Sequence, residues 1–506
     1  MMSKKALPAP SPVARKYPGS GTQQDPYVVD WDSEEDPENP LNFPNCKKWI
    51  ITSQLAFATW TISFGSSVYS GGLETMARDL NISDNVAILG LSLYVLGFAL
   101  GPLANLCSHG RDVWTTIRLF YYPCGIRCIS TRRMFGGTQR LCTAVVQVFH
   151  RHFWLFTPII GPIVGGAVVM KLEWHFNFWL MFIFSVLSLL SGAIFTPETY
   201  APVLLRRRTN KLARGSNGIV HYVSIHDCGR PKSIAQALLT TFSRPFVFLV
   251  TEPIVLCVAL YISIVYGTLY ALFAAFPIVF QQHHHFTSAQ NGLAFIGIGI
   301  GIILGLASTP IQNRVYWRAI EKSETGRAAP EARLHQAMVG GVLIPIGLFW
   351  FAFSVSPSVH WIVPIVGSAF FGMGISQILQ SLTSYLMDAY ELYFASAVAS
   401  TIVLRSVCAA FLPQVVPSMF SRLGDETAMC VFGVLGLICT PIPFLFWASL
   451  CRYYSPVHNF TYLLPLQRYG RWIRTKSSVA YKEPLSDSSS EITRCETQSE
   501  KDVEHP

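Results

Sequence analysis

The sequence predicts an all-α fold, a bundle of helices that crosses a membrane several times. Of its 506 residues, 51% are hydrophobic and only 13% are charged, whereas soluble domains carry roughly a quarter charged residues. Apolar runs of about 20 residues recur along the chain, which is the helix length that spans a bilayer core roughly 30 Å thick. The runs lack the alternation of barrel strands, so helices are the structure that satisfies their backbone polar groups in lipid.

Four apolar runs precede a basic stretch that starts at Arg206, and six follow it. The first four lie near 49–69, 86–106, 154–170 and 178–195, and the last six near 253–279, 294–311, 338–353, 361–382, 395–417 and 429–448. We therefore expect five segments, namely a disordered cytosolic tail (1–46), a first transmembrane half (47–196), a cytosolic central loop (197–244), a six-helix half (245–450) and a second cytosolic tail (451–506).

Basic residues mark one side of the membrane. Lys47 and Lys48 precede the first run, the central loop is rich in Arg and Lys, and five basic residues lie between Arg314 and Arg333. Because cytosolic loops are enriched in Lys and Arg, we expect all three segments and both termini to be cytosolic. The number of crossings between the second and third runs must then be even, which predicts ten or twelve in total. The net charge of +9 follows this loop pattern, so we expect no nucleic-acid partner.

Several segments, taken in order, resemble fungal transporters of the major facilitator superfamily, of the drug:proton antiporter type. Asp36–Phe43 is similar to the acidic stretch before the first helix in that family. Gly161-Pro-Ile-Val-Gly-Gly166 resembles the antiporter motif of the fifth helix, and Pro197–Arg206 resembles the exit from the sixth. Later segments resemble the ninth, eleventh and twelfth helices: Pro330–Leu334 and Gly347–Phe351, then Tyr385–Tyr390 and Leu404–Ser406, then Pro441–Phe446.

The resemblance implies two six-helix halves that move about a site at mid-membrane. It also implies proton-coupled export of small amphipathic compounds (drugs, toxins or secondary metabolites) by a monomer in the fungal plasma membrane, with the vacuolar membrane as the alternative. Uptake of a nutrient or polyamine, a membrane sensor, and a defective product of a transporter gene are the other hypotheses. The sequence shows no nucleotide-binding loop, metal-ligand set or nucleophile constellation, so we expect no enzyme activity and no cofactor.

The candidate substrate and proton pathway comprises Tyr261, Tyr266, Tyr270, Asp388 and Arg405. Helical spacing brings at least Tyr266 and Tyr270 onto one face, where aromatic rings offer an adaptable apolar surface. The alternative is that the tyrosines form bundle core or an interfacial belt. Asp388 and Arg405 are ionisable groups within spans, which favours a function, although a structural role near a helix end is the alternative.

Three further patterns carry predictions. Gly161, Pro162, Gly165 and Gly166 either act in antiport or only permit close helix packing. Asn81-Ile-Ser83 is a glycosylation sequon in the first outer loop. His283–His285 lies in a short outer loop, where solvation is favoured over metal binding, and four of the twelve cysteines lie in apolar runs.

Residues 103–153 do not fit the family pattern. They hold seven Arg, four Cys and no Lys, with Asp112 as the only acid, and the basic signature expected after the second helix is absent. An Arg at mid-bilayer costs about 2.5–3.5 kcal/mol on insertion scales, so two helices here would be heavily penalised. The fold prediction is therefore a twelve-helix pattern with an aberrant third and fourth helix, giving ten to twelve spans.

We hypothesise that this segment is translated from a shifted reading frame. Read one nucleotide later, codons for 110–117 permit Val-Glu-Met-Tyr-Gly-Arg-Arg, which resembles the missing signature, and the Gly is forced by Trp114 followed by Thr115. Resequencing the transcript tests this, since an intact frame encoding the present peptide would refute it. Residues 447–467 also interrupt the family pattern and are either a retained intron or an ordinary lengthened tail, which spliced mRNA would distinguish.

Overall fold

The computed structural model describes residues 17–19, 21–22, 26–33, 36–108, 157–199, 201–216, 220–225, 234–322, 329–390 and 394–454. All ten predicted spans are helical. They correspond to α1 (Asn45–Val68), α3 (Asp84–Ser108), α6 (Thr157–Lys171), α7 (His175–Phe195), α10 (Pro253–Phe276), α12 (Ile296–Ala307), α14 (His335–Phe353), α15 (Ile362–Ala389), α16 (Phe394–Leu423) and α17 (Asp425–Cys439) with α18 (Pro441–Tyr454).

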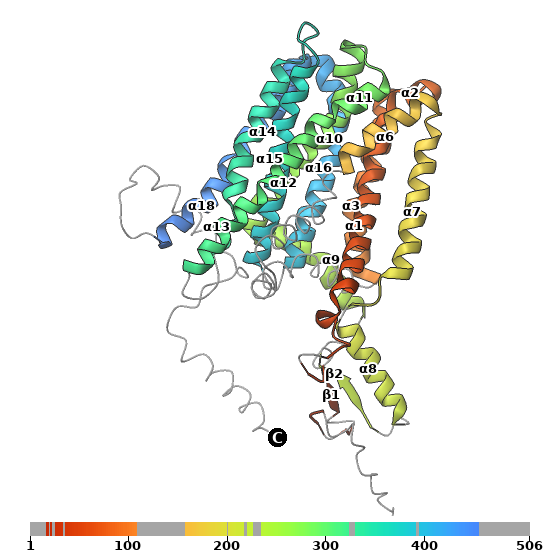
Figure 1. Cartoon of the computed structure of the whole chain (residues 1–506), viewed down its shortest axis with the longest axis vertical. Helices are drawn as coiled ribbons and strands as arrows, with labels where there is room; N and C mark the ends of the chain where they lie inside the picture. Colours follow the sequence, from red (N-terminus) through yellow and green to blue (C-terminus); the bar gives the residue numbers. More distant parts are fainter. Residues whose placement is uncertain are drawn as a thin grey trace, which may run out of the picture.

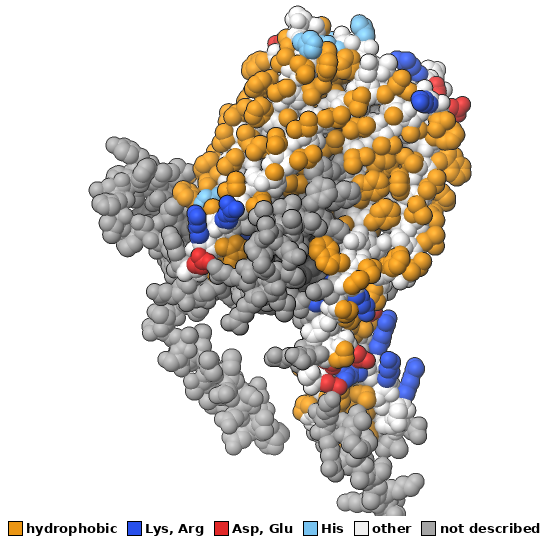
Figure 2. Space-filling view, in the orientation of Figure 1, with side chains coloured by type: hydrophobic (Ala, Val, Ile, Leu, Met, Phe, Trp, Pro, Cys, Tyr) orange, Lys and Arg blue, Asp and Glu red, His pale blue; other side chains and the backbone are white. Residues whose placement is uncertain are grey.

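Within the described residues, seven helical stretches are long and apolar enough to cross a membrane, and Asp84–Ala99 and Ile159–Lys171 are shorter apolar helices. α1 is not among the seven, since its many serines and threonines lower its hydropathy. The outward surface of the bundle is largely hydrophobic (Figure 2). Such a surface suits lipid contact, because lipid tails do not drive apolar side chains inward as water does.

The first half is built on α1, which packs against α3, α6 and α7. The short elements η3 (Tyr69–Gly72) and α2 (Leu73–Asp79) connect α1 to α3. α7 lies at the outside of the bundle (Figure 1), and no residue of its most apolar window is buried. The ring of its Phe184 packs edge-on against Trp60 and Phe64 of α1, with centroids 5.0 and 5.5 Å apart. α7 is therefore held by one narrow face.

The second half is a bundle in which α15 packs against α12 and α14, while α10 packs against α16 (Figure 1). Glycines allow the close approach: a Cβ on Gly301 of α12 would overlap the carbonyl oxygen of Ala369 in α15. Shorter elements complete this half: the π-helical turn η5 (Pro277–His283), α11 (Ser288–Ala294), α13 (Thr309–Lys322) and η6 (Pro330–Arg333).

The two ends of the bundle differ in their side chains. One end, which we call the histidine end, carries α2 and α11 (Figure 1), with η5 and its His283 packed against α11. There the Nε2 of His283 lies 2.8 Å from the Oδ2 of Asp425, so the histidine loop is tied to α17 rather than merely solvated. The opposite end, the arginine end, carries α8 with Arg208 and the end of α13 (Figure 1), against which η6 with Arg333 packs. Asn81 lies exposed at the histidine end with φ +52°, and its glycosylation stays a prediction.

The described part of the N-terminal tail is folded, which differs from the disorder expected for residues 1–46. Its strand β1 (Tyr27–Val29) pairs in parallel with β2 (Tyr222–Ser224), and η2 (Pro40–Asn42) leads into α1. The central loop is also partly helical, with α8 (Ala201–Gly215) and α9 (Ile234–Thr251). The difference arises because three-residue strands and a buried Asp36 give no periodic signal in the sequence.

Two sequence hypotheses lie mostly outside the described residues. Of the aberrant segment 103–153, only the last turns of α3 to Ser108 are described. Of the interrupted stretch 447–467, α18 accounts for residues up to Tyr454. The reading-frame and intron hypotheses therefore stay predictions.

Candidate functional site

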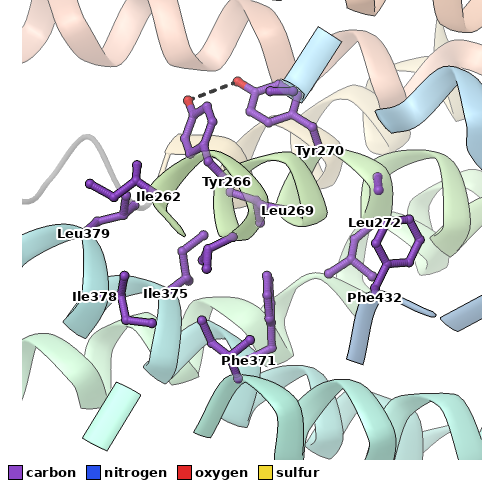
Figure 3. Close-up of a cluster of buried hydrophobic side chains, with 14 of the residues drawn as sticks. Ile262, Tyr266, Leu269, Tyr270, Leu272, Phe371, Ile375, Ile378, Leu379 and Phe432 are labelled. Carbon is purple, nitrogen blue, oxygen red and sulfur yellow. Dashed lines mark hydrogen bonds between the residues drawn. The ribbon is translucent and has the colours of Figure 1, made fainter. Parts of the chain in front are cut away.

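Tyr266 and Tyr270 of α10 lie at the contact between the two halves. They are one helical turn apart, both are buried, and their ring centroids are 5.1 Å apart. The Tyr270 hydroxyl lies 2.9 Å from the Oγ of Ser66 in α1, and the two tyrosine hydroxyls are 3.5 Å apart (Figure 3). The predicted shared face of Tyr266 and Tyr270 is thus present, and it meets a polar group of the opposite half.

Arg405 of α16 joins this pair of rings. Its guanidinium carbon lies 4.7 Å from the centre of the Tyr266 ring, a distance at which a cation is attracted to the ring face. A charged side chain within a membrane span is costly, so it is usually retained for a function or a specific partner. Three of the five predicted pathway residues therefore come together, from α10 and α16, beside Ser66 of α1. We call Ser66, Tyr266, Tyr270 and Arg405 the tyrosine cluster.

The other face of α10 is apolar. Ile262 and Leu269 point toward Phe371, Ile375 and other side chains of α15, away from the two tyrosine hydroxyls (Figure 3). This packing fixes the rotation of α10 about its axis, because the apolar side faces α15 inside the second half. The polar tips of the tyrosines are consequently directed toward the first half.

Tyr261 lies apart from the tyrosine cluster, which differs from the single set that we predicted. Its side chain is fully buried, and its hydroxyl lies against Gly341 of α14. A Cβ added to that glycine would be only 3.1 Å from the hydroxyl. Among the described residues this hydroxyl has no hydrogen-bond partner. Five residues separate Tyr261 from Tyr266, about one and a half turns, which rotates Tyr261 toward the α14 side of α10.

Asp388 also lies away from the tyrosine cluster, at the arginine end. Its Oδ2 accepts a hydrogen bond from the Nε of Arg333 at 2.9 Å, and the two side chains are only 18% and 13% exposed. The Arg333 guanidinium carbon lies 3.6 Å from the centre of the Tyr316 ring. Asp388 is the penultimate residue of α15, whereas the resemblance had matched it to the eleventh helix together with Arg405 of α16. The pair ties α15 to η6, so its geometry is that of a structural clamp.

The glycine motif of α6 lies between the halves. A Cβ on Gly161 or Gly165 would overlap atoms of Ser67 or Val68 in α1, and one on Gly166 would overlap the carbonyl oxygen of Ser288 in α11. Reciprocally, a Cβ on Gly292 of α11 would overlap the carbonyl oxygen of Pro162. α6 therefore touches α1 on one side and the second half on the other, near the histidine end.

Sequence reasoning missed the partners that the first half supplies. Ser66 was not predicted, although the run Gly65-Ser66-Ser67 of small residues in α1 is a signal for close helix contact. It also missed the hydrogen bond from Gln414 of α16 to the Oγ of Ser92 in α3, 3.1 Å long. Both contacts cross between halves, and a single chain position carries no information on its partner some 200 to 320 residues away.

Comparisons with known proteins agree with this architecture. The family model for the Major Facilitator Superfamily matches residues 143–413. The chain is 39% identical to the MFS-type efflux pump MFS2 of Trichophyton rubrum, over 85% of this chain and 77% of that protein. It is 35% identical to the efflux pump FUB11 of Gibberella moniliformis, over 92% and 80% of the two chains. It is 37% identical to the major facilitator superfamily multidrug transporter mdrA of Aspergillus fumigatus, over 85% and 75%.

The family match spans more than half of the chain, and each of these relatives is covered over at least three quarters of its length. The match includes α6 with its glycine motif, α10 with its tyrosines and most of α16 with Arg405. This chain belongs to the major facilitator superfamily.

Proposed function

We propose that the chain exports small amphipathic compounds, and that it does so in exchange for protons. The observation that carries the proposal is the tyrosine cluster, where aromatic rings and one cationic group meet at the contact between halves. Aromatic surface with few polar groups suits adaptable binding of amphipathic molecules. The names of the relatives, efflux pumps and a multidrug transporter, support export over uptake.

In this proposal the halves rock about the tyrosine cluster. Contacts at the histidine end close that side, through α6 against α11 and α3 against α16. The arginine end faces the cytosol, because basic residues of loops are enriched on that side of a membrane. The membrane is the plasma membrane, with both termini cytosolic, and one chain forms the complete transporter. Arg405 influences proton coupling through its charge, and Asp388 acts as a structural partner of Arg333.

The test is energised transport by the full chain. Proteoliposomes carrying the chain, with an imposed pH gradient, should accumulate a fluorescent amphipathic dye or a toxic fungal metabolite, and a protonophore should abolish this. Movement of the compound in the opposite direction under the same pH gradient would contradict export. Absence of any gradient-dependent flux would favour a sensor or a defective product, and the same chain carrying the frame-shifted reading across 110–140 would then separate these two.

Substitutions in the tyrosine cluster provide a sharper test. Tyr270→Phe removes the hydroxyl that meets Ser66 but keeps the ring, and one hydrogen bond is worth about 0.5–1.5 kcal/mol. We expect a roughly two- to tenfold change in apparent affinity for polar substrates. Tyr266→Ala removes the ring against Arg405 and should narrow the range of transported compounds. Tyr261→Phe is the matched control, since it removes a tyrosine hydroxyl from the same helix outside the cluster. An equal effect of all three would contradict the assignment.

A further inference from the structure

The described part of the N-terminal tail lies on the loop that joins the two halves. β1 pairs in parallel with β2, with Tyr27 opposite Tyr222 and Val29 opposite Ser224. A small apolar cluster, separate from the bundle core, accompanies the strands: it holds the buried side chains of Tyr17, Tyr27 and Val29, with Leu212, Val220 and Tyr222 packed on them. We call the described residues between Tyr17 and Asn42 the strap.

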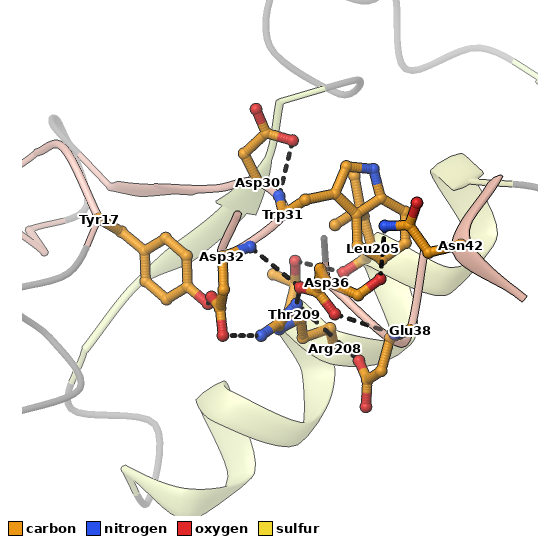
Figure 4. A network of polar contacts seen from close by, with 10 residues as sticks. All are labelled: Tyr17, Asp30, Trp31, Asp32, Asp36, Glu38, Asn42, Leu205, Arg208 and Thr209. Atoms are coloured by element: carbon orange, nitrogen blue, oxygen red, sulfur yellow. Dashed lines mark hydrogen bonds and ion pairs between the residues drawn. The ribbon is translucent and has the colours of Figure 1, made fainter. Parts of the chain in front are cut away.

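Arg208 of α8 is the centre of the polar contacts that hold the strap (Figure 4). Its guanidinium nitrogens lie 2.5 Å from Asp32 and 2.8 Å from Asp36, with Glu38 at 3.9 Å. The Tyr17 hydroxyl donates a hydrogen bond to the Oδ1 of Asp32, 2.9 Å long. The Arg208 side chain is 17% exposed and that of Asp36 is 4% exposed, so the centre of this ion cluster is largely shielded from water, whereas Glu38 at its edge is exposed.

Asp36 is the most enclosed member of the ion cluster, with 4% of its surface exposed. Both carboxylate oxygens are used: one accepts from Arg208 and from the amide of Asp32, the other from the amide of Glu38. Burial opposes the charge on Asp36, yet these hydrogen bonds outweigh burial and hold the pKa of the carboxyl below its usual value. Asp36 is therefore ionised at neutral pH and keeps its bond to Arg208.

The strap stays beside the first half because the chain continues from it directly into α1, and because its partner α8 follows closely after α7. The Asn42 side chain donates to the carbonyl oxygen of Asp36 at 3.0 Å, at the end of η2 and just before α1 begins at Asn45. α8 begins at Ala201, a few residues after α7 ends at Phe195. The strap thus joins the start of α1 to the segment that follows α7, and it holds β2 of the central loop in the same place.

We propose that the strap fixes the central loop to the first half and thereby limits how far the two halves can separate at the arginine end. With β2 held, the connection to the second half is the nine residue steps from Ile225, just after β2, to Ile234, which span at most about 30 Å. With the strap released, the connection starts at Gly215 at the end of α8, and its nineteen steps reach about 65 Å. The strap roughly halves the available reach.

A limit of this kind acts on one movement of the transport cycle. Opening at the arginine end moves α9 and α10 away from the first half, and the connection becomes taut only in that direction. Closing at the arginine end leaves it slack. Release of the strap therefore favours states that are open at the arginine end. The inference rests on the proposed rocking of the halves, but not on the substrate or on proton coupling.

The test measures the separation of the halves directly. Spin labels at Ile50→Cys in α1 and Arg318→Cys in α13 report the distance between halves at the arginine end, in the full chain in liposomes, in a background without other reactive cysteines. We expect Arg208→Gln to add a population at longer distance. Arg207→Gln is the matched control, because Arg207 is the preceding residue on α8, is 62% exposed and only approaches Glu198 at 3.9 Å. It should leave the distribution unchanged.

A reversible lock completes the experiment. Val28 lies opposite Val223, so Val28→Cys with Val223→Cys allows a disulfide between the strands, detected by mass spectrometry. In this version the two label positions, in α1 and α13, carry unnatural amino acids instead of cysteines. The disulfide is formed first, and the labels are then attached by chemistry orthogonal to thiols. In the Arg208→Gln background the oxidised form should lose the long-distance population, and reduction in the same sample should restore it. Identical distributions in the oxidised and reduced forms would overturn the proposal. These distances need no substrate, so a failure of transport and a failure of the strap are distinguishable.

Discussion

Gly165→Val is expected to reduce export per molecule by roughly tenfold. A Cβ at this position would overlap the backbone carbonyl oxygen of Val68 in α1, and backbone cannot move aside as a flexible side chain can. Overpacking a close contact costs about 1–3 kcal/mol, and 1.4 kcal/mol corresponds to roughly a factor of ten. Since the contact lies where α6 also meets α11, the added side chain disturbs the closure of the histidine end. Export rate, normalised to the amount of inserted protein, is the measurement.

The matched control is Gly97→Val in α3. Among the described residues, and leaving aside the neighbouring residues and backbone of α3 itself, nothing lies within 4 Å of a Cβ built on Gly97, so valine there meets open space. Export should stay close to that of the unaltered chain. Valine also has a higher helix propensity than glycine, so neither substitution weakens the helix itself. Equal activity of the two variants would show that close approach of α6 and α1 is not needed for export.

Arg333→Ala is expected to lower both the stability and the transport rate. The substitution leaves the Asp388 carboxylate, 18% exposed, without the Nε bond at 2.9 Å. Removing one member of a buried ion pair costs about 3–5 kcal/mol, and we expect the lower part of this range because both side chains retain some exposure. The ring of Tyr316 also loses its cation. Thermal unfolding in detergent, followed with transport in liposomes, measures the effect.

Two comparisons interpret the Arg333 result. Removing both charges together, by Arg333→Leu with Asp388→Leu, should recover much of the stability, because no uncompensated charge remains. Arg207→Ala removes an arginine that is 62% exposed and only approaches Glu198 at 3.9 Å, so it should change the melting temperature little. If the double variant melts as low as Arg333→Ala, the loss arises from packing rather than from the unpaired carboxylate.

The sequence predicts the helices and the family well because these depend on long, redundant signals. The all-α membrane fold and the major facilitator superfamily are confirmed, and each of the ten predicted spans is a helix. Tyr266 and Tyr270 were placed on one face by their spacing alone. Each of these inferences rests on neighbours within one helix, where geometry follows directly from separation along the chain.

The remaining contacts could not be predicted because their partners lie far apart in the chain. Ser66 and Tyr270 are 204 residues apart, and Arg333 and Asp388 are 55 apart. Asp388 is an acid near the end of an apolar run, which the sequence alone treats as a proton-pathway candidate, whereas its partner Arg333 lies in the short helix η6. The strap was not predicted for a similar reason: acidic and proline-rich residues indicate disorder unless the arginine that binds them is known.

The parallel pairing of β1 with β2 also orders events during synthesis of the chain. The tail leaves the ribosome first, but its partner strand lies 195 residues later, beyond every helix of the first half. At about 5–20 residues per second, the tail waits roughly 10–40 s for that strand. Until α8 and β2 have been made, Asp32 and Asp36 have no Arg208 to bind and β1 has no partner strand. The strap is therefore made first but is among the last parts of its half to fold. It can dock only after all helices of the first half have been synthesised.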